Sequence, residues 1–199
     1  MSIETTFNKL SARVKASLIR KLLQNRYEQM ADGGLFLPKE RIALRGVFSL
    51  SCNGGPVSLH PNTVVREGRN HMLNVVLHNE SQITDWYMAL FSGDVTPQGD
   101  TWTAANFAAV ATEITDYDEA DRPSFLVGDA IDGVSSNLTN EAAYTMNEVG
   151  SVYGGAIISS SEKGGSTGIL LAAARFQNKR DYEPTDNLNV GYEIGLTST

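Results

Sequence analysis

The fold of this chain is decided by one stretch, Ile83-Thr84-Asp85-Trp86-Tyr87-Met88-Ala89-Leu90-Phe91-Ser92-Gly93. The stretch is rich in aromatic and large apolar residues and ends in a Gly-Asp turn, which is typical of a buried β-strand. A tryptophan inside a short strand usually anchors a core. We therefore predict three core anchors, which are Trp86, Leu90 and, from a later strand, Tyr192.

A short helix is expected on each side of this strand. Residues 67–78 place apolar side chains such as Met72 and Val76 at spacings of three and four, which favours a helix over a strand. Residues 103–111 are rich in alanine, the best helix former.

The rest of residues 41–199 has the character of β-structure. Residues 42–50, 152–159 and 168–176 are apolar runs bounded by turns that are rich in Gly, Asn and Ser. The clearest period of two occurs where Leu188, Val190, Tyr192 and Ile194 alternate with small or polar residues. The pattern predicts a mainly β fold, with a β-sandwich or jelly-roll-like body.

The N-terminal residues differ in character, and residues 3–30 predict one long helix. Their apolar residues recur at helical spacing and form a stripe, which consists of Phe7, Leu10, Val14, Leu18 and Leu22. The pair Gly33-Gly34 is expected to end this helix. The predicted organisation is therefore a helical arm and linker over residues 1–40, the N-terminal arm, followed by a β-sandwich over residues 41–199.

Charge separates the two regions. Residues 1–31 carry six basic and two acidic groups, a net charge of +4, whereas the whole chain has −7, which leaves −11 for residues 32–199. A basic arm on an acidic body suggests a protein partner for the arm, and nucleic acid is a poor partner for the acidic body. The predicted partner-binding residues are Phe7, Leu10, Arg13, Val14, Leu18, Arg20, Lys21 and Leu22. The helix could pack on its own body or on a neighbour, and a membrane-surface role fits less well because the basic groups are scattered.

No catalytic constellation is visible, and we predict a protein that is not an enzyme, without cofactor or metal. The acidic run Asp116, Asp118, Glu119 and Asp121 lacks the EF-hand spacing and is expected to be a solvated loop, in which Arg122 could pair with an acid. The lone Cys52 excludes an intrachain disulfide. No apolar run is long enough to span a membrane, and the N-terminus lacks a secretory pattern.

Several short motifs in order carry a resemblance to a known group of proteins. They begin with Gly-x-Asn-His-Met-Leu-Asn-Val from Gly68 and continue with Trp86–Phe91 and Arg122-Pro123. Further on follow Val152-Tyr153-Gly154-Gly155-Ala156 and Leu170–Phe176. Between Val64 and Leu196 the chain resembles virion proteins of tailed bacteriophages, including capsid cement (decoration) proteins of short-tailed phages.

The resemblance implies a function that composition and spacing do not. It implies a β-sandwich or jelly-roll-like body that binds the assembled capsid surface and forms homo-oligomers there. The expected partners are the major capsid protein and further copies of the chain, and the expected location is the virion, assembled in the host cytoplasm. A tail or fibre component that contacts the host is the alternative, and a glycan-binding β-sandwich is a more distant one.

Overall fold

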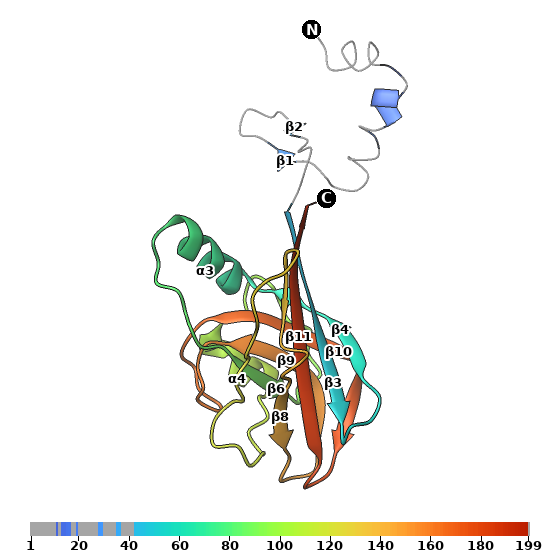
Figure 1. The fold of residues 1–199 in the computed structure, drawn as a ribbon, viewed down its shortest axis with the longest axis vertical. Helices are drawn as coiled ribbons and strands as arrows, with labels where there is room; N and C mark the ends of the chain where they lie inside the picture. Colours follow the sequence, from blue (N-terminus) through green and yellow to red (C-terminus); the bar gives the residue numbers. More distant parts are fainter. Residues whose placement is uncertain are drawn as a thin grey trace. The chain divides into compact units, whose positions relative to one another are not determined.

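The computed structural model describes residues 11, 13–16, 19, 28–29, 35–36 and 42–198. The chain divides into two compact units. One unit is Ala43–Thr197, which we call the body, and the other is Met1–Ile42 with Ser198–Thr199. Figure 1 shows the body as packed β-sheets with two helices.

Two antiparallel sheets form the body, as the sequence predicted. The first sheet has the strand order β5 (Thr63–Val64), β10 (Leu170–Tyr182), β9 (Gly150–Ile158) and β6 (Tyr87–Phe91). The second has the order β4 (Ser58–Pro61), β3 (Ile42–Cys52), β11 (Asn187–Ser198) and β7 (Val134–Ser136), and β8 (Ala142–Thr145) also pairs with β11. The pairs β3–β4 and β9–β10 are antiparallel neighbours in sequence and in space.

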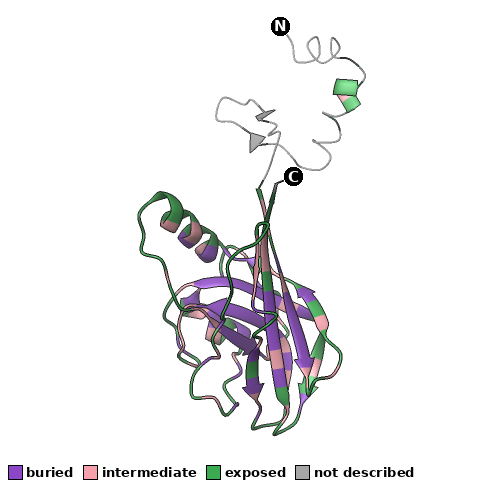
Figure 2. Ribbon diagram, in the orientation of Figure 1, coloured by how far each residue is buried: buried purple, intermediate pink, exposed green. Residues whose placement is uncertain are grey.

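The main core lies between the two sheets. Alternate residues of β11 point into it, and Leu188, Val190 and Tyr192 have essentially no exposed surface. Phe48 from β3 and Phe176 from β10 pack beside them. Figure 2 shows buried positions of these strands alongside half-buried and exposed ones. The period-two prediction is confirmed for Leu188, Val190 and Tyr192, whereas Ile194 is half-buried and Gly191 is buried.

The first sheet is covered on its outer face as well. In β6, Met88 and Leu90 belong to the core between the sheets. Ala89 and Phe91 point the other way, into a second cluster with Trp102 and residues of α4 (Ala104–Ala111). A strand that is buried on both faces loses its alternation and becomes a continuous apolar run, which explains the composition of this segment.

Both predicted short helices are present, as α4 and as α3 (Arg66–Leu77). Glu67 of α3 connects the two helices to the first sheet, because its carboxylate accepts hydrogen bonds from the backbone N–H groups of Ala104 (2.8 Å) and Leu170 (2.7 Å). Gly68 lets α3 approach β10 closely, since a Cβ there would lie 2.4 Å from the carbonyl oxygen of Leu171. Among the described residues, no helix is long and apolar enough to cross a membrane.

The prediction for the N-terminal arm is wrong in part. No continuous helix over residues 3–30 is seen, because Glu28–Gln29 forms strand β1 and pairs with β2 (Leu35–Phe36). Helical backbone is described at residues 13–16 and 19. Gly33-Gly34, the expected end of the helix, lies outside the described residues.

Candidate functional site

The predicted partner-binding residues fall mostly outside the described part of the chain. Six of them have no described structure, and they are Phe7, Leu10, Leu18, Arg20, Lys21 and Leu22. Arg13 and Val14 are described, and both lie in helical backbone with exposed side chains. Val14, which belongs to the apolar stripe, is 47% exposed.

Two of the three predicted core anchors are buried, and the third is only partly buried. Leu90 and Tyr192 are fully buried, whereas Trp86 is only partly buried and packs at the margin of the core. The strand begins one residue later than Trp86, at Tyr87, and residues 83–86 are loop rather than strand. The other tryptophan, Trp102, is the buried one, and it contacts Phe91 and Phe107 edge-on.

The acidic run lies at the surface, and one of its residues is hydrogen-bonded to strand β8. Asp116, Asp118 and Asp121 are exposed, and Glu119 accepts a hydrogen bond from the backbone N–H of Thr145, with 3.1 Å to each carboxylate oxygen. Within the part of the chain that the structure describes, no group of three or more His, Cys, Asp or Glu side chains is placed to hold a metal ion.

We expect calorimetric titration with calcium to show no binding tighter than about millimolar, the weak end for protein sites. The reason is that the carboxylates have separate partners, since Glu119 accepts from the backbone N–H of Thr145 and Asp118 accepts from the side-chain amide of Asn147 (3.3 Å). A matched variant, Asp118→Asn with Asp121→Asn, should give the same titration as the unchanged chain. Micromolar binding of about one ion per chain, abolished in that variant, would show that the loop is a metal site.

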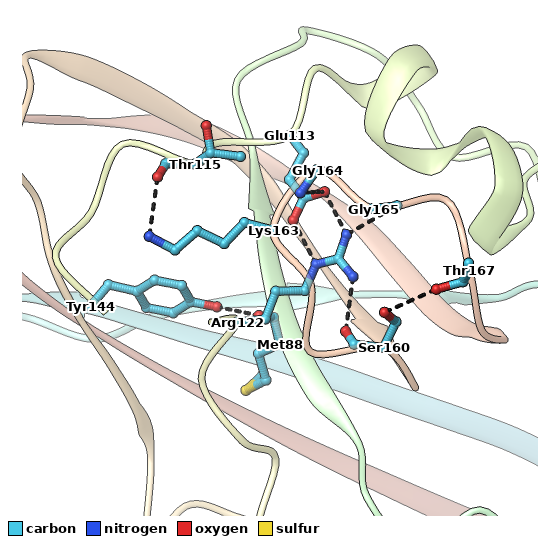
Figure 3. Close-up of polar contacts among 10 residues, drawn as sticks. All are labelled: Met88, Glu113, Thr115, Arg122, Tyr144, Ser160, Lys163, Gly164, Gly165 and Thr167. Carbon is cyan, nitrogen blue, oxygen red and sulfur yellow. Dashed lines mark hydrogen bonds and ion pairs between the residues drawn. The ribbon is translucent and has the colours of Figure 1, made fainter. Parts of the chain in front are cut away.

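A buried ion pair lies next to this loop (Figure 3). Its arginine is Arg122, and its acid is not one of the acidic run, in which the sequence suggested a partner. Arg122 pairs with Glu113, which lies outside the acidic run, through Nε to Oε1 at 2.6 Å and Nη2 to Oε2 at 2.7 Å. Both side chains are almost completely buried. The guanidinium also donates to the carbonyl oxygens of Ser160 (2.8 Å) and Gly165 (3.2 Å). Arg122 therefore links the β9–β10 connection, through its hydrogen bonds, to the segment that follows α4 and contains Glu113.

Two tyrosines and a lysine extend this network toward the main core. Lys163 donates to the carbonyl oxygen of Tyr117 (2.7 Å), and its Nζ lies 3.9 Å from the centroid of that ring. Tyr117 packs edge-on against Tyr144, whose hydroxyl donates to the carbonyl oxygen of Met88 (2.7 Å). Burial raises the pKa of both phenols, so that they stay protonated at neutral pH. These contacts connect the loops around the ion pair to the main core.

The structure does contain an open apolar site, a pair of hollows beside α3 that we call the α3 groove. The larger hollow has a volume of about 300 Å³ and the smaller one about 120 Å³, and both are lined by Met72 and Ile194. The remaining lining residues of the larger hollow are His71, Val75, Val76, Gln82, Ile83, Trp86 and Leu171. Leu44, Ala130, Gly133, Ser135, Gly195 and Leu196 complete the smaller one.

The helix beside this groove exposes much of its apolar surface. Within α3 only Gly68 and His71 are buried. Leu73 is more than half exposed, and Val76 and Leu77 are 78% and 77% exposed. Figure 2 shows α3 as mostly exposed. The apolar face that predicted this helix is thus largely uncovered within the body, and contiguous exposed apolar surface is typical of a protein-binding site.

His71 and Cys52 both lie in surroundings that are at least partly buried. His71 is buried, contacts the Trp86 ring and lies 2.8 Å from the Glu80 carboxylate through Nδ1, a hydrogen bond that lowers the pKa of Glu80. Partial burial and the nearby Asp186 raise the pKa of Cys52, which keeps it a thiol at neutral pH. A protonated thiol is a poor nucleophile.

His60 is predicted to make the stability of the body depend on pH. Its ring stacks on Phe176, and its Nδ1 accepts a hydrogen bond from the backbone N–H of Gln177 (3.2 Å). Burial lowers the pKa of His60 below its ordinary value. The unfolded chain therefore binds this proton more readily, and stability present above about pH 6.5 is lost as the pH falls through the lowered pKa.

Thermal unfolding between pH 7.5 and 5 should measure this loss. Protonation of Nδ1 removes the acceptor of the Gln177 N–H, and a hydrogen bond of this kind contributes about 0.5–1.5 kcal/mol to stability. The His60→Gln variant should lose most of the pH dependence in this range, whereas the exposed-residue variant His78→Gln should keep it. Equal pH dependence in the two variants would contradict the role of His60.

Comparisons with known proteins do not extend these observations. No protein-family model matches the chain, and no curated protein matches it.

Proposed function

We propose that this chain is a non-enzymatic structural protein of a tailed-phage virion, and specifically a cement protein that binds and stabilises the assembled capsid. The proposal rests on the resemblance described above together with the place of its motifs in the body. The coarser part of the fold expectation, a body of two antiparallel sheets, agrees with the resemblance.

One observation carries the proposal. Three separate motifs of the resemblance meet at the α3 groove, because His71 and Met72 come from the first, Trp86 from the second and Leu171 from the last. Segments that are separate in sequence thus contribute to one apolar surface. Such a surface, held on a rigid sandwich, suits association with protein partners.

In the proposed mechanism, many copies of the chain hold neighbouring capsid subunits together through individually weak contacts. Each copy would bury surface across neighbouring capsid subunits that come together only in the assembled shell. A ligand that binds the assembled state alone stabilises it by mass action, and copies linked to one another add an avidity term. The proposed partners are accordingly the major capsid protein and further copies of this chain.

A tail or fibre component is the alternative within the same particle. A glycan-binding sandwich has one observation in its favour, since the partly buried Trp86 lines a hollow where a sugar ring could stack. The residues around Trp86 are mainly apolar, however, and polar groups are needed to orient a sugar.

Binding to purified shells tests the proposal. We expect the chain to sediment with assembled capsid shells of its virus, to saturate at a fixed number of copies and to raise the melting temperature of the shells. The matched control is the unassembled capsid protein, which should bind much more weakly because it lacks the composite surface. Equal binding to both forms, or no binding to shells, would contradict a cement function.

A further inference from the structure

We propose that the α3 groove binds the N-terminal arm of a second copy of this chain. The proposal concerns self-association and does not depend on the capsid. Its three supporting observations are the compact core that the body has of its own, the apolar surface of the groove and the charges around it.

The body has a hydrophobic core of its own among the described residues. The buried members of both hydrophobic clusters lie between Phe48 and Tyr192, and the body is a compact unit by itself. The described member of this stripe, Val14, has an exposed side chain.

The groove offers the apolar surface that such a stripe requires. Met72 and Ile194 lie at its centre, and the exposed side chains of Val76 and Leu196 are among its lining residues. An amphipathic helix binds a groove of this kind through residues spaced three and four apart. In the N-terminal arm, Phe7, Leu10, Val14, Leu18 and Leu22 have that spacing.

The charges around the groove favour a basic occupant. The loops that line it, residues 79–86 and 126–135, contain four exposed carboxylates and no Lys or Arg, and these acids are Glu80, Asp85, Asp129 and Asp132. The last turn of α3 has no basic residue either, so the negative end of its dipole is not compensated there. The two arginines of α3, Arg66 and Arg69, lie in its first turn.

The N-terminal arm has the charge and the apolar residues that suit the α3 groove. Residues 1–31 have a net charge of +4 and combine six basic groups with the apolar stripe. The apolar contact would supply affinity, and opposite charges would supply orientation and a faster encounter. Because each copy carries both the arm and the groove, this exchange links copies into the oligomer that a decorating protein needs.

Sedimentation velocity of the full-length chain tests the proposal. We expect concentration-dependent association that weakens about tenfold or more in the variant Val76→Gln/Leu77→Gln and equally in Leu18→Gln/Leu22→Gln. The matched control is Val57→Gln/Leu59→Gln, which removes two exposed apolar side chains away from the groove and should associate normally. All variants should melt like the unchanged chain.

Charge reversal tests direct contact between the two parts. Asp85→Lys/Asp129→Lys and Arg20→Glu/Lys21→Glu should each weaken association, and a mixture of these two variants should associate more strongly than either alone. Cross-linking shows whether the arm in the groove belongs to the same chain or to a second copy. In a Cys52→Ser background, separately tagged Leu18→Cys and Leu77→Cys chains should form a mixed disulfide between the two chains.

Several results would overturn the proposal. One is a chain that stays monomeric at every concentration. Another is association that survives the groove variants or the arm variants, and a third is a Leu18→Cys/Leu77→Cys double variant that cross-links only within one chain. Failure here leaves shell binding as a separate result, so the proposed function and this proposal can fail independently.

Discussion

Replacing Arg122 by methionine is expected to destabilise the body by about 3–5 kcal/mol, the usual cost of breaking a buried ion pair. The reason is that Glu113 would remain buried without its partner at 2.6 Å, and the carbonyl oxygens of Ser160 and Gly165 would lose a donor. Urea unfolding followed by circular dichroism measures this difference, and the m-value shows whether the folded state keeps its compactness.

Two further variants separate the ion pair from general loss of charge. Arg122→Met combined with Glu113→Leu should recover part of the lost stability, because the uncompensated carboxylate is then gone. Lys179→Met removes an exposed partner of Asp181 and should leave the free energy of unfolding nearly unchanged, because solvent screens such a pair. An Arg122→Met variant as stable as Lys179→Met would contradict the structural role of the buried pair.

Truncation of Trp102 to alanine is expected to have a similar effect, a loss of about 3–5 kcal/mol. Trp102 is 6% exposed and packs edge-on against Phe91 and Phe107, which joins α4 to the outer face of the first sheet. Removing it opens a cavity in the second cluster and loosens that cover. The same unfolding experiment gives the change in free energy.

Trp86→Ala is the matched comparison, because it removes the same side chain from a partly buried site. We expect a loss of about 1–2 kcal/mol, in proportion to the smaller apolar area removed from the core. A loss as large as that of Trp102→Ala would mean that Trp86 is a core anchor after all, and the groove would then be less open than described.

The sequence was sufficient for most of the body, because local periodicity reports burial directly. In β11, Leu188, Val190 and Tyr192 alternate with small or polar residues, and these three side chains are buried in the structure. The helical spacing in α3 and the alanine-rich run of α4 were also informative. These signals depend on near neighbours in the chain, which is the range that a pattern can describe.

Long-range partners could not be predicted in the same way. Nothing in the sequence distinguishes Trp86 from Trp102 until α4 is placed over the first sheet. Similarly, Arg122 lies among nearby acids but pairs with Glu113, and it also donates to carbonyl groups of the β9–β10 connection, Ser160 and Gly165 (Figure 3). Glu28–Gln29 pairs as a strand with Leu35–Phe36 where the end of a helix was expected.

The candidate site was missed for the same reason. Periodicity predicted an apolar face on this helix, but it shows only that a face is apolar and not what covers it. Only the assembled body shows Val76 and Leu77 exposed beside a hollow lined by Trp86, Leu171 and Ile194.

The position of this chain in purified virus particles tests the central proposal most directly. Electron cryomicroscopy of the particles, combined with quantitative mass spectrometry, would give both the location and the copy number. The proposed cement function predicts many copies at regular positions on the outer capsid surface, in contact with one another and with neighbouring capsid subunits. Density confined to the tail or fibres, or particles that lack the chain, would contradict it.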